Sequence, residues 1–179
     1  MSKYIEELKR SMKMLSQNDK TIFIGQSIIY KGNAVFETLE DVSIDKRIEF
    51  PVAENLQMGV SLGLALNGDI PISIYPRFDF LVLALDQLVN HIDKWPLISQ
   101  GKSLPKVIVR VVVGSDKPLD PGHQHKADYT EALKLMCKTI DVIKLDDYTK
   151  IYPAYELALN REDGKSTVLI EYGNLYNGI

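Results

Sequence analysis

One acidic residue, Glu54, stands between a short extended segment and a run of small apolar residues. The segment ends Phe50-Pro51-Val52-Ala53-Glu54, and the run that follows predicts a tightly packed helix that starts at Pro51 and ends near Asn67-Gly68. A carboxylate in the first turn of a helix is stabilised by the helix dipole. If it is also removed from water, its pKa rises and it can take part in acid–base chemistry. Glu54 is therefore either a plain helix-start charge or a catalytic group.

Two histidines and one cysteine are the other residues that could carry chemistry. His123 and His125 offer two imidazoles, but no cysteine lies nearby and the one further histidine is His91, so we expect no metal site. Cys137 has apolar neighbours in a predicted helix, which favours a place in the core over a nucleophile. The sequence holds neither a glycine-rich phosphate-binding loop nor a G-x-S-x-G elbow.

Hydrophobic patterns predict alternating strands and helices that would position these residues. Strands are predicted at 21–26, 47–50, 70–75, 106–114, 141–145 and 166–172. Helices are predicted at 2–17, 51–67, 79–95, 127–137 and 148–160, with a loop and a short helix within 32–42. The strand at 106–114 is apolar on both faces except for Arg110, which is typical of a central parallel strand.

This alternation predicts an α/β fold, a three-layer αβα arrangement with a mostly parallel sheet covered on both faces. In such sheets ligands bind outside the carboxyl ends of the strands. The loops at those ends are 25–33, 75–80 and 114–126, and they are the best candidates for a site.

The composition sets further bounds. With 179 residues, of which 45% are hydrophobic, the chain fits a single domain over residues 1–179. A net charge of −3 gives no basic field for nucleic acid, and no apolar stretch has the length of a membrane span. One cysteine gives no sign of an oxidising compartment. We expect a soluble, cytoplasmic protein whose ligand is a small molecule.

Three stretches together resemble a known family. They are RIEFPVAENLQMGVSLGLALNGDIPISIYPRFDF, then LDQLVNHI, then VIVRVVVG leading to HQHKAD. Their order and spacing resemble the beta subunits of the first components of 2-oxo acid dehydrogenases. More broadly, the whole chain is similar to the pyrimidine-binding domain of the transketolase group of thiamine diphosphate enzymes. The resemblance therefore implies a transketolase-type pyrimidine-binding domain.

The resemblance also implies roles for five residues. Glu54 matches the glutamate that hydrogen-bonds the pyrimidine ring of the cofactor and activates it. Phe80 matches the ring that stacks on the aminopyrimidine, and Phe78 is a wall residue. Gln26 stands where the family has an acid facing the active-site channel, and His125 matches a histidine near the substrate. The alternatives remain open: Phe80 as a core residue of the next helix, and His125 as a solvated loop histidine.

The sequence departs from the family at several points. Gln26 is neutral, so it can hydrogen-bond but cannot share a proton. Pro76 and Arg77 stand where the family is often apolar or small, and Arg77 either recognises an anionic substrate or lies exposed on the surface. The family's C-terminal domain, and the diphosphate-binding half with its GDG motif, are not in the sequence. A pyrimidine domain alone cannot hold diphosphate and Mg²⁺, so the resemblance implies a partner.

Two functional hypotheses follow. In the first, the chain is a subunit of an enzyme that acts on a 2-oxo acid or a ketose through thiamine diphosphate. It would pair with a diphosphate-binding, alpha-type subunit that binds Mg²⁺, as part of a homodimer or heterotetramer. In the second, it is a non-catalytic assembly or regulatory module. The sequence names neither substrate nor acceptor, and it does not separate a natural minimal subunit from a fragment.

Overall fold

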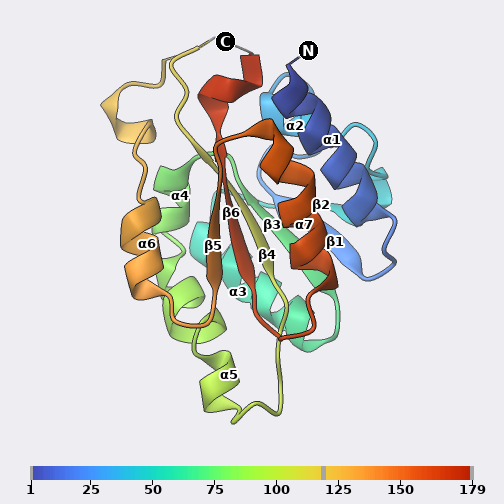
Figure 1. Cartoon of the computed structure of the whole chain (residues 1–179), viewed down its shortest axis with the longest axis vertical. Coiled ribbons are helices and arrows are strands. Elements are labelled where there is room, and N and C mark those ends of the chain that lie inside the picture. Colours follow the sequence, from blue (N-terminus) through green and yellow to red (C-terminus); the bar gives the residue numbers. More distant parts are fainter. Residues whose placement is uncertain (1, 118–119, 178–179) are drawn as a thin grey trace.

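Six parallel strands form one sheet between two layers of helices (Figure 1). The structure is a computed structural model, and it describes residues 2–117 and 120–177. The strand order is β2-β1-β3-β4-β6-β5, and every strand pair in it is parallel. The strands are β1 (Thr21–Gly25), β2 (Arg47–Glu49), β3 (Ile70–Tyr75), β4 (Ile108–Val113), β5 (Asp141–Leu145) and β6 (Thr167–Tyr172). The predicted α/β fold is confirmed.

Burial of the strands follows their place in the sheet. All six residues of β3 are buried, and so are the first five of β4 and of β6, because helices cover both of their faces. The edge strands β2 and β5 are mostly half-buried. The β-branched runs found in the sequence therefore occupy the centre of the sheet.

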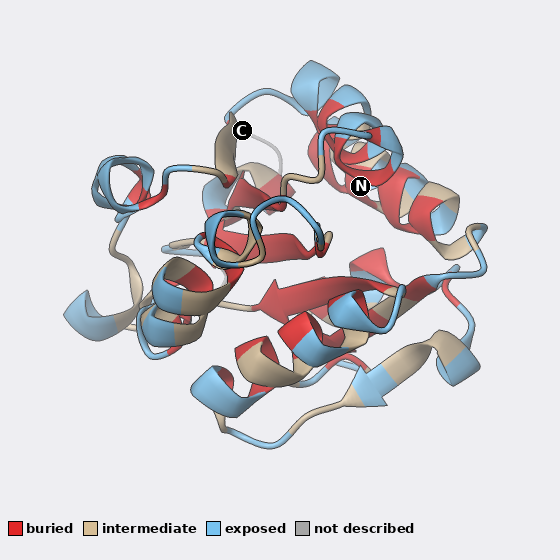
Figure 2. Cartoon of the chain, turned by 90° about the horizontal axis from the view of Figure 1, so that it is seen from below, coloured by how far each residue is buried: buried red, intermediate tan, exposed pale blue. Residues whose placement is uncertain are grey.

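The helices divide between the two faces of the sheet, and their buried sides face inward (Figure 2). One face carries α1 (Lys3–Ser16), α2 (Ala34–Thr38) and α7 (Ile151–Asn160). The other carries α3 (Glu54–Leu66), α4 (Phe78–Val82) and α6 (Thr130–Met136). In α1, the buried residues recur at the helical spacing seen in the sequence: Tyr4, Ile5, Leu8, Met12 and Leu15. None of the helices among the described residues is both long and apolar enough to cross a bilayer.

Two predicted features of the helices are wrong. Pro51 lies outside α3, which begins at Glu54 after the half-extended Ala53. The single helix predicted over 79–95 is divided into α4, a π-helical segment (Asp86–Ile92) and α5 (Trp95–Ile98). In the π-helical turn, the Asp93 N–H donates to Leu88 O, five residues back, at 2.9 Å. This wider turn brings Asp93 onto the buried side with Leu88, which a regular helix of the same residues would not do.

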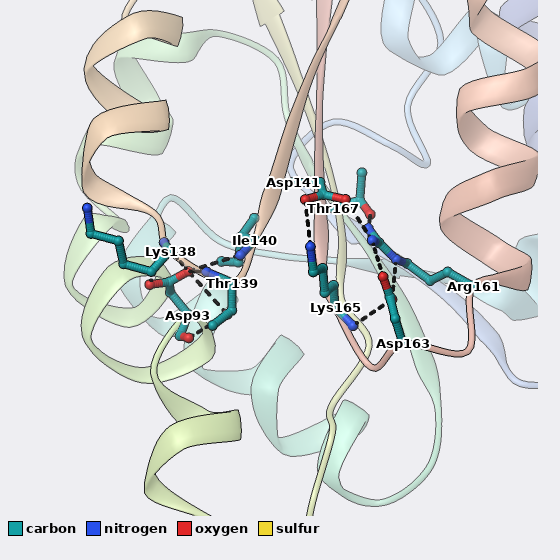
Figure 3. Close-up of polar contacts among 9 residues, drawn as sticks. All are labelled: Asp93, Lys138, Thr139, Ile140, Asp141, Arg161, Asp163, Lys165 and Thr167. Carbon is teal, nitrogen blue, oxygen red and sulfur yellow. Dashed lines mark hydrogen bonds and ion pairs between the residues drawn. The ribbon is translucent and has the colours of Figure 1, made fainter. Parts of the chain in front are cut away.

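Asp93, at the end of the wider turn, is buried and hydrogen-bonded. Its carboxylate is 1% exposed and accepts hydrogen bonds from the backbone N–H groups of three consecutive residues, Lys138, Thr139 and Ile140, at 2.7–3.0 Å (Figure 3). The Thr139 hydroxyl donates to Asp93 O at 2.5 Å. These bonds fasten the helical layer to the turn that enters β5, at the amino edge of the sheet.

We predict that Asp93→Ala lowers the free energy of unfolding by about 2–4 kcal/mol, because three backbone donors lose their acceptor. Urea denaturation followed by circular dichroism measures this loss. The matched control is Asp19→Ala, at an exposed aspartate, which should leave the denaturation midpoint unchanged. Equal midpoints for the two variants would contradict a clamping role for Asp93.

A second cluster at the same edge is centred on Arg161, at the end of α7 (Figure 3). Its guanidinium donates to Asp141 at 2.6 Å, to Asp163 at 2.7 Å and to the Thr167 hydroxyl at 2.7 Å. The hydrogen bonds from Arg161 lower the pKa of the Asp163 carboxyl to about 2. The end of α7 is thereby tied to the first residues of both β5 and β6.

Arg110, the polar exception in β4, lies in the centre of the molecule. It and Glu171 of β6 are both 0% exposed. Arg110 Nε donates to Glu171 Oε1 at 2.6 Å, Nη2 donates to Oε2 at 3.0 Å, and Nη1 donates to the Thr38 hydroxyl at 2.7 Å. Tyr155 and Tyr176 also donate their hydroxyls to Glu171. One ion pair therefore joins the sheet to α2, to α7 and to the segment after β6.

We predict that Glu171→Gln destabilises the protein by about 3–5 kcal/mol, because it leaves the Arg110 charge buried without its counter-ion. The double variant Arg110→Met, Glu171→Leu should lose clearly less free energy of unfolding, since it removes both charges. Guanidinium denaturation compares the two. Asp146→Asn, in an exposed pair with Lys150, serves as the surface control and should change little. A single variant as stable as the control would refute this account.

Candidate functional site

The loops predicted to carry a site follow β1, β3 and β4 and meet at the carboxyl edge of the sheet, at the top of Figure 1. This placement is confirmed for the described residues. Pro118 and Leu119, within the loop after β4, lie outside them. The start of α3 reaches the same edge, because the Tyr75 hydroxyl at the end of β3 donates to Glu54 O at 3.2 Å.

Glu54 is a buried carboxylate with few partners. It is 5% exposed, and its Oε1 accepts one hydrogen bond, from Gln26 Nε2 at 3.3 Å. Among the described residues no second donor contacts this carboxylate. A buried carboxylate is costly unless its oxygens are well paired, and Glu54 has a single protein donor for its two oxygens. The structure thus brings together Gln26 and Glu54, which are 28 residues apart.

A chain of buried polar groups supports the start of α3 from below. Gln57 Nε2 donates to the Ser73 hydroxyl at 3.2 Å and to Ile74 O at 3.1 Å, and the Ser73 hydroxyl lies 3.5 Å from the Tyr75 hydroxyl. Burial raises the pKa of Tyr75, so its hydroxyl keeps its proton and donates to Glu54 O. Sequence reasoning missed this support. Its signal was Gln57, a polar residue one turn after Glu54 on the same side of an apolar helix.

Phe80 and His125 are in contact. Their ring centroids lie 5.2 Å apart with planes at 66°, an edge-to-face arrangement, and both side chains are half-buried. His125 Nδ1 is buried and has no hydrogen-bond partner among the described residues. Phe78 is fully buried instead, with its ring edge-on to Tyr129 at 5.7 Å. Phe80 and His125 therefore present a partly open aromatic corner, and Phe78 packs behind it.

A second carboxylate, Glu49 at the end of β2, holds the loop that follows Gln26. It accepts hydrogen bonds from the N–H groups of Ser27, Ile28 and Ile29 at 2.6, 2.8 and 3.2 Å. Ser27 has a φ of +58°, which is unusual for a residue with a side chain. Glu49 thus stabilises a strained turn that aims Gln26 at Glu54, and sequence reasoning did not single it out.

Comparison with known proteins gives one consistent answer. No family model matches the chain. It is 28% identical over 166 residues to the "Pyruvate dehydrogenase E1 component subunit beta" of Gracilaria tenuistipitata var. liui, covering 90% of this chain and 50% of that protein. It is 28% identical over 100 residues to the "3-methyl-2-oxobutanoate dehydrogenase subunit beta" of Mycobacterium tuberculosis (strain CDC 1551 / Oshkosh), covering 54% of this chain and 29% of that protein. The chain resembles 2-oxo acid dehydrogenase beta subunits.

Solved structures of transketolases share the fold of this chain. A structure described as "Split gene transketolase, inactive beta4 tetramer" matches with a TM-score of 0.72 and 18% identity, over 94% of this chain and 51% of that one. The chain spans about half the length of the Gracilaria dehydrogenase subunit and of the split-gene transketolase. The predicted transketolase-type fold is confirmed by this match.

The remaining candidate residues, His123 and Cys137, make no contact with Glu54 among the described residues. His123 is exposed. The described residues contain no group of three or more His, Cys, Asp or Glu side chains able to hold a metal ion. Cys137 is buried after α6, and burial, with a smaller effect from Asp93, raises the pKa of its thiol to about 12.

We predict that Cys137 is an unreactive thiol at pH 8. With its pKa raised from 9.0 to about 12, the thiolate fraction in the folded protein is about 1,000-fold lower than in the unfolded chain. A thiol-reactive chromogenic disulfide, applied with and without guanidinium, measures the two rates. The folded-state pKa is the higher one, so this thiol's contribution to stability is full below pH 9 and is lost as the pH rises toward 12. Reaction rates within tenfold of each other would contradict the burial of Cys137.

Proposed function

We propose that the chain is a subunit of a thiamine diphosphate-dependent enzyme that acts on a 2-oxo acid or a ketose. In this proposal it forms a shared site with an alpha-type subunit that holds the diphosphate and Mg²⁺. The observation that carries the proposal is Glu54, a buried carboxylate at the carboxyl edge of the sheet with a single donor at 3.3 Å. The similarity to dehydrogenase beta subunits supports the same class of enzyme.

The residues present fit the pyrimidine half of the cofactor. Glu54 offers a carboxylate oxygen without a protein donor, which suits a ring nitrogen that shares a proton. Phe80 offers a half-buried ring for stacking, and the unpartnered Nδ1 of His125 lies beside it. When bound, thiamine diphosphate supplies carbanion chemistry, and the protein supplies position and proton control.

Each residue of the candidate site has a distinct part in this proposal. Glu54 holds or releases a proton at its Oε2, while Gln26 keeps Oε1 oriented. Phe80 would offer its ring to the pyrimidine for stacking, with Phe78 as the wall behind it. His125 orients the substrate or moves a proton at Nδ1. Tyr75 and Gln57 position the backbone of Glu54 rather than contact the cofactor.

The partner is part of the proposal for a structural reason. The described residues contain no cluster of acidic side chains for Mg²⁺, and the relatives are named as subunits. One structural neighbour is described as a "beta4 tetramer" of a split-gene transketolase. These observations support a hetero-oligomer in which this chain also contacts a copy of itself. A cytoplasmic location is proposed on the composition alone.

One observation favours a second candidate, a non-catalytic assembly or regulatory module. Gln26 is neutral where the resembling family has an acid, so the channel lacks one group able to exchange protons. Titration of thiamine diphosphate and Mg²⁺, into the chain alone and into its mixture with a candidate diphosphate-binding subunit, separates the two candidates. A heat of binding that is seen with the mixture but not with the chain by itself supports the enzyme. No binding to a complex confirmed by light scattering supports the module.

We predict that Glu54→Gln lowers the activity of the reconstituted complex by at least about 100-fold, because an amide cannot exchange the proton. Assembly, measured by light scattering, should remain unchanged. Glu156→Gln is the matched control, since Glu156 is exposed on α7 and its loss should leave activity intact. Activity of the Glu54 variant within threefold of the control would refute the catalytic role.

A further inference from the structure

The segment from Lys94 to Lys106 projects beyond the amino edge of the sheet, at the end of the molecule opposite the candidate site (Figure 1). It contains α5 and the loop that leads into β4. Two side chains of α5, Leu97 and Ile98, are 66% and 63% exposed, and Leu104 in the loop is 46% exposed. Three aliphatic side chains therefore lie in water on a projecting part of the surface.

Hydrogen bonds within the projecting segment keep it ordered. The Gly101 N–H donates to Pro96 O at 2.8 Å, and the Ser99 hydroxyl donates to Ser103 O at 2.9 Å. At the start of α5, the half-buried ring of Trp95 packs against the hydrophobic core of the α3–α4 face. Because the segment is already ordered, binding through its aliphatic side chains would not have to order it first.

The charges around these aliphatic side chains are positive. Lys94, Lys102 and Lys106 are the charged residues of the segment 94–106, which contains no Asp or Glu, although the whole chain has a net charge of −3. Lys138 lies close by, since its N–H donates to the buried carboxylate of Asp93 at 2.9 Å. None of these four lysines forms an ion pair with a carboxylate among residues 2–117 and 120–177.

Three of these lysines are exposed beside the aliphatic side chains, and the fourth, Lys106, is half-buried and donates to Leu159 O at 2.7 Å. We call the exposed group the amino-edge patch; it consists of Lys94, Leu97, Ile98, Lys102, Leu104 and Lys138. The patch thus combines an aliphatic tip with positive charge that no carboxylate of the described residues neutralises.

The size and shape of the amino-edge patch favour a lipid surface over a protein partner. A stable protein interface buries about 800 Å² of each partner, far more than three partly exposed aliphatic side chains present. A bilayer needs no matching groove, because aliphatic side chains on a projecting segment can enter the region between the headgroups and the acyl chains. Lysines beside them are attracted to anionic headgroups.

We propose that the amino-edge patch docks the protein on the surface of an anionic lipid bilayer. Leu97 and Ile98 would enter the interfacial region, and Lys94, Lys102 and Lys138 would contact the headgroups. The docking is peripheral, since none of the helices among the described residues is long and apolar enough to cross a bilayer. The candidate site lies at the opposite edge of the sheet and would face away from the lipid (Figure 1). The proposal is independent of the proposed function.

Trp95 is the single tryptophan of the chain and lies at the start of α5, so its fluorescence reports this docking without a label. The test adds vesicles of equal parts phosphatidylcholine and phosphatidylserine, with brominated acyl chains that quench tryptophan at close range, to the full chain. We expect quenching of Trp95 and cosedimentation of the protein with these vesicles. Both effects should be lost with phosphatidylcholine alone and in high salt, which screens the lysines.

Substitutions in the patch should weaken vesicle binding while circular dichroism stays unchanged. Lys102→Gln should weaken it about fivefold, the contribution expected of one lysine near an anionic surface. Leu97→Ser combined with Ile98→Ser should weaken it at least about tenfold, because the aliphatic area that enters the bilayer is removed. The matched controls are Lys31→Gln and Leu157→Ser, at an exposed lysine and an exposed leucine outside the patch, and both should bind like the unaltered protein.

Three outcomes would overturn the proposal. The first is no cosedimentation with the anionic vesicles, or equal binding by the Leu97, Ile98 double variant and the Leu157 control. The second is cosedimentation without quenching of Trp95, which would place the lipid contact on another surface. The third is a dimer, detected by light scattering, that the double variant dissociates, since the patch would then be covered by a second copy of the chain.

Discussion

The buried ion pair between Arg110 and Glu171 is the interaction on which the rest of the arrangement depends. Both side chains lie on adjacent strands, β4 and β6, and are fully buried, so a single unpaired charge there would be very costly. The pair is stable there because Thr38, Tyr155 and Tyr176 satisfy the remaining donors and acceptors. Since these partners come from α2, from α7 and from the segment after β6, one constraint holds three outer elements against the sheet.

Buried carboxylates at the two edges of the sheet differ in how many hydrogen bonds they accept. At the amino edge, Asp93 accepts from three backbone N–H groups, and Arg161 joins two strand starts to α7. At the carboxyl edge, Glu54 has one donor at 3.3 Å, and His125 Nδ1 has no partner. A buried polar group whose hydrogen-bonding capacity is fully used is typical of a structural role. Buried polar groups that lack protein partners are typical of sites where a ligand supplies the partner.

The same contrast separates Glu54 from Glu49, which lie five residues apart. The Glu49 carboxylate accepts hydrogen bonds from the backbone of the turn at Ser27, and this turn positions Gln26. Gln26 in turn donates to one oxygen of Glu54, and the other oxygen has no donor among the described residues. A neutral amide beside Glu54 adds no second negative charge, so in the proposed site proton exchange rests on Glu54 and, farther along the edge, on His125.

The sequence by itself determined the elements, because hydrophobic period and turn residues are local properties. It identified the strands, the loops of the carboxyl edge, the acid at the start of α3 and the exceptional Arg110. Only the tertiary structure decided the strand order, the π-helical turn at Asp93, the choice of Glu171 as partner for Arg110, and the contacts of Gln26 with Glu54 and of Phe80 with His125. The three side-chain pairs join residues 28 to 61 positions apart, and local periodicity assigns a residue to a face without naming its neighbour across the fold.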